Sequence, residues 1–102
     1  MSADANELLS TAEVDAALAE LGGWVRAGDE LRRILRFDDF RAAFAFLTEV
    51  ALLAEEHDHH PELRNSYRDV ELRLKTHSAG GLTARDLYLA GEIEEVLRTG
   101  EP

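Results

Sequence analysis

The chain contains no cysteine among its 102 residues. Disulfide bonds, thiolate zinc sites, iron–sulfur clusters and cysteine nucleophiles are therefore excluded. Basic residues are also scarce, because 11 lysines and arginines stand against 21 acidic residues and give a formal net charge of −10. Nucleic acids and anionic membrane surfaces are bound mainly through positive charge, so we expect neither as a partner.

A long apolar run is absent as well. No stretch approaches the roughly 20 apolar residues of a transmembrane helix, and the start MSADANELLS has neither the basic nor the apolar region of a secretion signal. We therefore expect a cytoplasmic protein. The hydrophobic fraction of 45% still describes a folding chain with room for one core. We expect a flexible N-terminus at 1–9, a single domain at 10–98 and a tail at 99–102.

Three stretches have the three-and-four spacing of apolar residues that is typical of amphipathic helices. Ser10 and Glu13 have the spacing of a capping box, and Gly22-Gly23 ends the helix that follows them. Aspartate and threonine are suitable caps for the other two helices. The predicted helices are 11–21, the stretch from Asp38 or Asp39 to His57, and the stretch that follows Thr83.

The second helix is apolar around more of its circumference than one sheet face can cover. We expect one stripe to cover the sheet and a second stripe, beside it, to face outwards. Three large apolar side chains exposed in a row would make a monomer adhesive, so we expect a homodimer or homotetramer. The first stripe is Phe40, Ala43, Phe44, Leu47, Ala51 and Ala54, and the second is Phe46, Val50 and Leu53.

Four further stretches alternate between apolar and polar residues and predict two β-hairpins. Gly28-Asp29 suits the first reversal, and a turn at Arg68-Asp69 would place the apolar residues of the second hairpin on one face. Arg33 interrupts the apolar face of its strand, as Glu94 does that of the last helix. The order α-β-β-α-β-β-α predicts an α+β fold, with an antiparallel sheet covered by helices on one face. The strands are 24–27, 31–37, 62–67 and 70–75.

All four histidines lie between residues 57 and 77, and the predicted hairpin register places His60 opposite His77. Histidine suits proton transfer because its unperturbed pKa is about 6.5, and Glu55 and Asp58 lie close enough in sequence to fix imidazole tautomers. We interpret the cluster as an acid/base site. A His/Glu metal site is the alternative, although the adjacent His59 and His60 cannot easily point at one ion.

Seven residue types occur at defined spacings, namely Glu55, His59-His60-Pro61, Tyr67, His77 and Asp86. This pattern resembles the signature of the pterin-4a-carbinolamine dehydratase family. Weaker similarity extends over about residues 22–96 and includes the pair Arg85-Asp86. Two positions depart from the family pattern, since Leu63 stands where an aromatic residue is frequent and Ser78 where an acidic residue is common.

The resemblance implies a four-stranded antiparallel sheet with three helices on one side. It also implies an activity, the dehydration of 4a-hydroxytetrahydropterin to quinonoid dihydropterin in tetrahydropterin recycling, with the pterin as substrate and neither metal nor cofactor required. A non-catalytic dimerisation or assembly factor of the same fold is the alternative. The implied roles are catalysis by His59, His60 and His77, substrate contacts by Asp58, Thr76 and Ser78, and support by Glu55 and Asp86.

Overall fold

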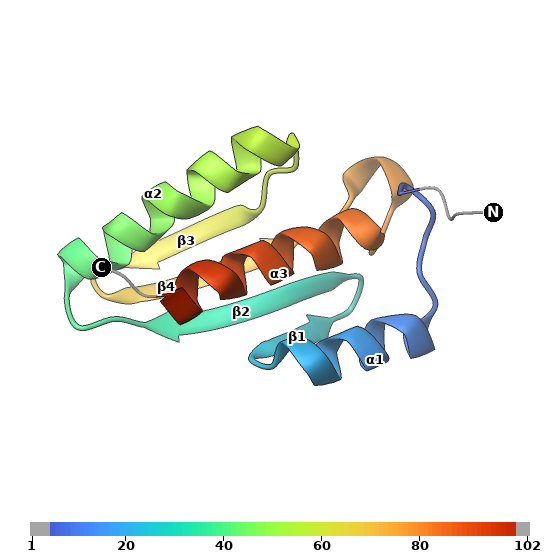
Figure 1. The fold of residues 1–102 in the computed structure, drawn as a ribbon, viewed down its shortest axis with the longest axis horizontal. Helices are drawn as coiled ribbons and strands as arrows, with labels where there is room; N and C mark the ends of the chain where they lie inside the picture. Colours follow the sequence, from blue (N-terminus) through green and yellow to red (C-terminus); the bar gives the residue numbers. More distant parts are fainter. Residues whose placement is uncertain (1–4, 100–102) are drawn as a thin grey trace.

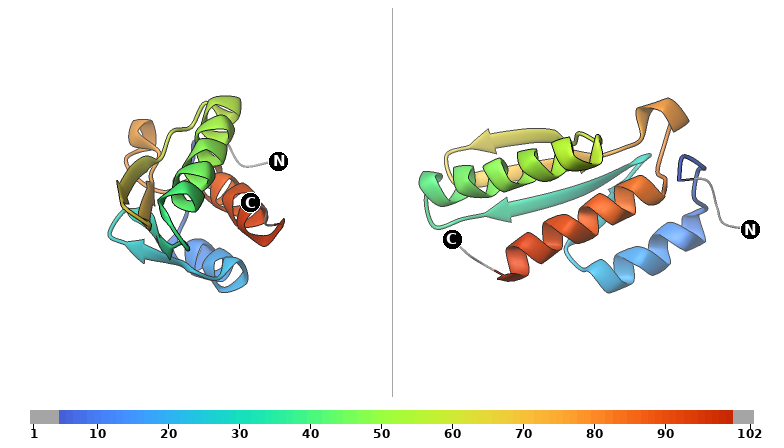
Figure 2. Two further views of the ribbon diagram at one scale, coloured as in Figure 1. Left: turned by 90° about the vertical axis from the view of Figure 1, so that its left-hand side faces the viewer. Right: turned by 45° about the horizontal axis from the view of Figure 1, so that its top comes forward.

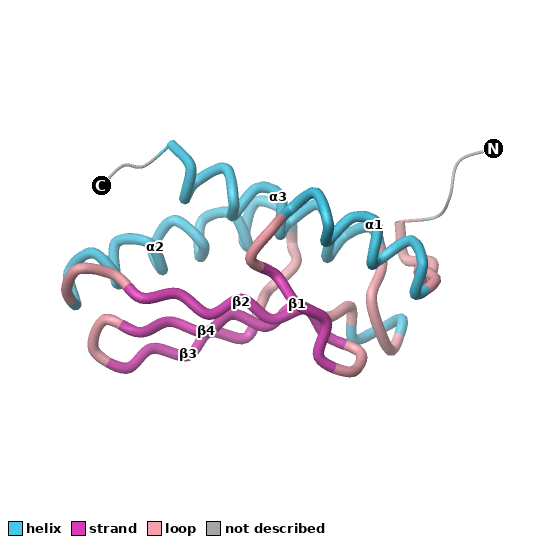
Figure 3. The backbone as a smooth tube through the Cα atoms, turned by 90° about the horizontal axis from the view of Figure 1, so that it is seen from below, coloured by secondary structure: helices cyan, strands magenta, loops and turns pink. Residues whose placement is uncertain are grey.

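A four-stranded antiparallel sheet carries three helices on one face (Figures 1 and 3), which confirms the predicted fold class and element order. The structure is a computed structural model that describes residues 5–99. The strands are ordered β1-β2-β4-β3. The elements are α1 Thr11–Leu21, β1 Trp24–Ala27, β2 Glu30–Arg36, α2 Phe40–His57, β3 Glu62–Ser66, β4 Asp69–Leu74, the short 3-10 helix η1 His77–Ala79 and α3 Ala84–Thr99.

The central helix of the layer is α3, which packs between α1 and α2 (Figures 1 and 2). Its buried residues Leu89, Ala90 and Ile93 meet the sheet residues Leu31 and Leu72 in one hydrophobic core. Within residues 5–99, no helix is both long and apolar enough to cross a membrane.

Side-chain caps start the first two helices, as the sequence predicted. Ser10 Oγ accepts from the amide of Glu13 at 3.1 Å, and the Glu13 carboxylate accepts from the Ser10 amide at 2.7 Å. Of the two aspartates proposed for α2, Asp39 is the cap, since its carboxylate accepts from the Ala42 amide at 2.8 Å. Each bond satisfies an amide that the helix itself leaves without a partner.

The chain ends differ in part from the tails expected from the sequence. Within residues 5–9, the Asn6 side chain accepts from Arg85 at 3.2 Å, and the Leu9 amide donates to the carbonyl of Leu82 at 2.9 Å. At the other end, Thr99 is the last residue of α3. Residues 1–4 and 100–102 of the expected tails lie outside the described residues.

The register of the second hairpin differs from the prediction. Leu63 pairs with Leu72 and Asn65 with Val70, so the turn is at Tyr67-Arg68 and not at Arg68-Asp69. The predicted register is wrong by two residues. A shift of two leaves every side chain on its original face, so the hydrophobic pattern could not distinguish the two registers.

A polar side chain closes the turn in the observed register. The amide nitrogen of Asn65 donates to the carbonyls of Tyr67 and Asp69, each at 3.0 Å. Tyr67 has a positive φ of 55°, and Asp69 is consequently a strand residue paired with Arg36 of β2. β4 therefore begins at Asp69, one residue before the start predicted from the sequence.

Three residues of the first stripe of α2 are buried as expected, but the rest of the assignment of the two stripes was wrong. Phe46 and Val50, expected at the surface, are buried, whereas Phe40 and Phe44 are 49% and 53% exposed. The apolar arc is wide, and its periodicity does not say which part faces the sheet. Contact between Phe46 and Phe37, with ring centroids 5.1 Å apart, turns the helix so that the second stripe enters the core.

The two charges that interrupt the apolar faces pair with each other. The Glu94 carboxylate accepts from Arg33 Nε at 2.8 Å and from the Trp24 indole nitrogen at 2.7 Å. Gly23 is required beside them, because a Cβ at this position would lie 2.5 Å from the Arg33 guanidinium carbon and its φ is +82°. The pair therefore ties α3 to the β1–β2 hairpin.

We predict that Glu94→Ala lowers the free energy of unfolding by about 2 kcal/mol, because a mostly buried guanidinium and an indole N–H lose their acceptor. Urea unfolding followed by circular dichroism measures the change. Glu95→Ala is the matched control, since Glu95 pairs with Arg98 at the surface and its loss should change stability by less than about 0.5 kcal/mol. Equal losses in the two variants would contradict the structural role of Glu94.

Candidate active site

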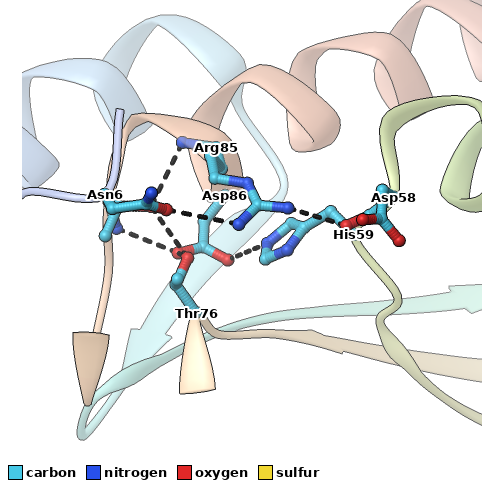
Figure 4. Close-up of polar contacts among 7 residues, drawn as sticks. Asn6, Asp58, His59, Thr76, Arg85 and Asp86 are labelled. Carbon is cyan, nitrogen blue, oxygen red and sulfur yellow. Dashed lines mark hydrogen bonds and ion pairs between the residues drawn. The ribbon is translucent and has the colours of Figure 1, made fainter. Parts of the chain in front are cut away.

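The end of α2 places His59 against the first turn of α3 (Figure 4). Asp58 is left-handed, with φ 49° and ψ 46°, and the His59 amide donates back to the Ala54 carbonyl at 3.0 Å. This turn directs the His59 ring into the protein, where only 7% of the residue is exposed. Its Nε2 lies 2.6 Å from Oδ1 of the fully buried Asp86.

Asp86 makes further bonds that fix the proton on His59. Its Oδ2 accepts from the Thr76 hydroxyl at 2.7 Å and from the Thr83 amide at 2.9 Å. Because Oδ2 accepts from two donors, we interpret Oδ1 of the same carboxyl group as the acceptor and the ring nitrogen that faces it as the donor. We therefore assign the proton of neutral His59 to Nε2, which leaves the lone pair on Nδ1.

Thr76 lies inside this network and away from solvent. Its hydroxyl is bonded both to Asp86 and, at 2.7 Å, to the Thr83 hydroxyl, and only 2% of the residue is exposed. Its amide donates to Gly81 at 3.0 Å. The structure thus places Thr76, expected as a substrate contact, in the buried hydrogen-bond network around Asp86.

His60 points outwards, although it follows His59 directly. Its Nε2 lies 2.7 Å from the Glu55 carboxylate, and the two side chains are 54% and 78% exposed. The expected link between Glu55 and an imidazole is therefore present in the structure. Two adjacent histidines thus occupy opposite environments, one buried on Asp86 and one exposed on Glu55.

His77 and Ser78 lie in η1, which follows Thr76 directly. Both residues are exposed. Cross-strand pairing of His60 with His77 was wrong, because the last pair of the ladder is Glu62 with Arg73 and both histidines lie beyond it. The two segments leave the sheet at the same end of the hairpin, and Thr76 joins the second segment to Asp86.

Charged groups also lie beside His77. The Lys75 ammonium is 2.9 Å from the Asp29 carboxylate. This hydrogen bond lowers the pKa of Asp29 and raises the pKa of Lys75. Asp29 belongs to the β1–β2 turn, so the ion pair holds that turn close to Lys75, which lies two residues before His77.

His57 does not join the other three histidines. Its ring contacts Tyr88 edge to face, with centroids 5.1 Å apart, and its Nε2 is 3.9 Å from the Glu92 carboxylate. Both contacts are on α3. Over residues 5–99, no three His, Asp or Glu side chains converge as ligands for a metal ion.

Arg85 appeared only within the weaker family similarity, and the sequence assigned it no role at the site. Its Nη2 donates to the Asp58 carbonyl at 2.7 Å, and its Nη1 donates to the Asn6 side-chain oxygen at 3.2 Å (Figure 4). A signal was available in the sequence. The first turn of a helix disfavours cations, so an arginine between the Thr83 cap and Asp86 indicates a specific partner.

The chain is similar to known proteins in its sequence. A family profile described as pterin 4 alpha carbinolamine dehydratase matches residues 7–96. A relative from Afipia carboxidovorans, provisionally named as a pterin-4-alpha-carbinolamine dehydratase, is 49% identical over 92 residues, which are 88% of this chain and 92% of the relative. A relative from Rhodopseudomonas palustris (strain BisB18), named in the same way, is 52% identical over 83 residues, or 79% and 82% of the two chains.

A solved structure supports the fold. The crystal structure of a protein titled transcriptional coactivator/pterin dehydratase, from Brucella melitensis, superposes with a TM-score of 0.82. The two sequences are 38% identical, and the match covers 85% of this chain and 95% of the other.

We predict that Asp86→Asn moves the proton of neutral His59 from Nε2 to Nδ1. The introduced amide group donates towards Nε2, while its oxygen still accepts from Thr76 and Thr83. Long-range proton–nitrogen NMR of the His59 ring reports the tautomer directly. Glu55→Gln, which alters only the exposed partner of His60, should leave the His59 tautomer unchanged. A His59 ring protonated on Nδ1 in the unmodified protein would contradict the assignment.

Proposed function

The chain belongs to the pterin-4a-carbinolamine dehydratase family, and we propose that it dehydrates 4a-hydroxytetrahydropterin to quinonoid dihydropterin and water. The observation that carries this proposal is the histidine pair His59 and His60, one held by a buried carboxylate and one exposed on Glu55. The family and the geometry together support an enzyme, a hydro-lyase. We propose that it acts in the cytoplasm on a small-molecule pterin and needs no cofactor.

The reaction needs two proton transfers. The C4a hydroxyl accepts a proton as its C–O bond breaks and it leaves as water, and a ring N–H loses its proton as the C=N bond forms. Imidazoles suit both steps because they exchange protons near neutral pH. We assign this work to His59, His60 and His77 jointly. Asp86 stabilises the imidazolium form of His59, in the way a buried carboxylate supports a catalytic histidine.

The groups around the histidines have separate proposed roles. Asp58 and Ser78 adjoin the catalytic residues in sequence and are proposed as substrate contacts. Thr76 and Asp86 are buried and satisfied by each other, so we propose that they support the site. Glu55 has the same supporting role for His60.

An assay with purified protein and freshly generated 4a-hydroxytetrahydropterin tests the proposal. We expect the protein to accelerate formation of quinonoid dihydropterin without added metal, and prior treatment with a chelator to leave the rate unchanged. Activity lost on chelation and restored by zinc or iron would establish the metal-site alternative. A folded protein without activity would favour the non-catalytic alternative, for which the coactivator title of the Brucella structure is the supporting observation.

Substitution of single histidines tests the site itself. We predict that His60→Ala and His77→Ala each lower kcat/KM at least about tenfold, because one general acid or base contributes typically about 10²–10⁴ in rate. His57→Leu is the matched control. His57 lies in the same stretch but contacts Tyr88 on α3, so its loss should change the rate less than about twofold. Full activity in both alanine variants would contradict the assignment.

We also propose that the protein is a homodimer or homotetramer, through a different surface from the one expected from the sequence. Phe40 and Phe44 expose about half of their surface, and their rings lie 5.6 Å apart on α2. The edge strand β3 is paired with β4 on one side only within the described chain. Antiparallel pairing with a second copy centred on Leu63 would set Glu62 opposite Arg64, which is electrostatically complementary.

We predict that Phe44→Glu lowers the assembly mass of the protein in light scattering, because a charge on the covered surface is costly to bury. Leu52→Glu is the control, since Leu52 is 60% exposed and lies about 80° around α2 from Phe44. Glutamate at Phe46 or Val50 would instead unfold the domain, because both residues are in the core. Unmodified protein that is monomeric at tens of micromolar would overturn this proposal.

A further inference from the structure

We propose that Arg85 is a positioning residue for the histidine segment, residues 58–60, and that Asn6 holds Arg85 in place from the N-terminal segment, residues 5–9. The structural part of the proposal stands on contacts alone. Only its effect on catalysis rests on the proposed dehydratase function.

Arg85 binds the backbone at the point where α2 changes direction. Its Nη2 donates to the Asp58 carbonyl at 2.7 Å. Asp58 is in the left-handed region, which is unfavourable for a residue with a Cβ, so its conformation needs support from its surroundings. The next residue is His59, whose amide closes the turn on Ala54 at 3.0 Å. The hydrogen bond from the charged Arg85 to the Asp58 carbonyl thus stabilises the turn that orients the histidine side chains.

Two adjacent residues of α3 therefore hold two adjacent residues of the histidine segment. Arg85 binds the backbone of Asp58, and Asp86 binds the ring of His59 (Figure 4). A ring bound at one nitrogen can still pivot about that bond, whereas a second attachment through the backbone limits the pivot. Small displacements of a catalytic group reduce rate strongly, so the second attachment matters for chemistry.

The position of Arg85 is electrostatically costly unless it is compensated. A cation in the first turn of a helix faces the positive end of the helix dipole. The Asp58 carbonyl and the Asn6 side-chain oxygen, at 2.7 and 3.2 Å, supply two acceptors for the guanidinium group. The guanidinium is planar and presents donors in a fixed fork, so holding one arm on Asn6 also sets the direction of the other.

The N-terminal segment is itself attached next to Arg85. The Leu9 amide donates to the Leu82 carbonyl at 2.9 Å, and Leu8 lies so close to Gly81 that a Cβ there would be 3.0 Å from the Leu8 methyl carbon. These contacts bring Asn6 to the start of α3. Residues that precede the first helix thereby extend the support of the histidine segment.

Amide hydrogen exchange tests the structural part. We expect Arg85→Met to accelerate exchange of the His59 amide about tenfold or more, because a charged hydrogen bond contributes about 1.5–3 kcal/mol. Asn6→Ala should accelerate it about two- to fivefold, and Arg85→Lys should fall between Arg85→Met and the unmodified protein. The amide of Val50, buried in the middle of α2, should not respond. Arg36→Met is the matched control, since Arg36 pairs with Asp69 near the hairpin turn of the sheet.

Steady-state kinetics tests the catalytic part in the same variants. We expect Arg85→Met to lower kcat about fivefold or more with KM changed less than about twofold, and Arg85→Lys to restore part of kcat. Exchange at His59 no faster than in Arg36→Met would overturn the proposal, as would equal acceleration at His59 and Val50. If the unmodified protein shows no dehydratase activity, the proposed function fails while the exchange measurements still decide the role of Arg85.

Discussion

A fully buried carboxylate, that of Asp86, is the constraint on which the rest of the site depends. A buried charge is costly unless hydrogen-bond donors surround it, and removing one donor leaves the charge buried without a full set of partners. Asp86 receives its donors from three separate segments, namely His59 after α2, Thr76 after β4 and the Thr83 amide before α3. The end of α2, the end of β4 and the start of α3 must therefore meet at one point.

The same logic operates at a second place on α3. Glu94 lies two turns beyond Asp86 and takes its donors from Arg33 and Trp24 of the β1–β2 hairpin. The two carboxylates thus fix one helix against both halves of the sheet, while Leu89 and Ile93 supply the apolar contacts between them. Apolar packing alone would tolerate small slides and rotations of α3, whereas two directional polar attachments define a single position. The orientation of the site follows from that position.

Most of the fold was predictable because local signals agreed with one another. Capping residues such as Ser10 and Asp39 fixed helix starts, and alternation predicted four strands at the correct places along the chain. The misses share a physical origin. The hydrophobic pattern could not decide the hairpin register, because both registers place each side chain on the same face. Asn65 sets the register through the hydrogen bonds that close the turn, and such bonds leave no periodic pattern in the sequence. The apolar pattern of α2 did not decide how the helix is rotated about its axis. The contact of Phe46 with Phe37 sets that rotation.

Motif spacing selected the residues of the candidate site, but it did not predict the separate environments in which the structure places them. Spacing treats His59 and His60 alike, and only the left-handed Asp58 separates them into one buried and one exposed imidazole. This separation has a chemical consequence. A ring on a buried carboxylate has a fixed tautomer, whereas a ring at the surface can exchange its proton with water. A reaction that takes a proton at one atom and gives one at another is served by such a pair, since the two imidazoles differ in environment without differing in residue type.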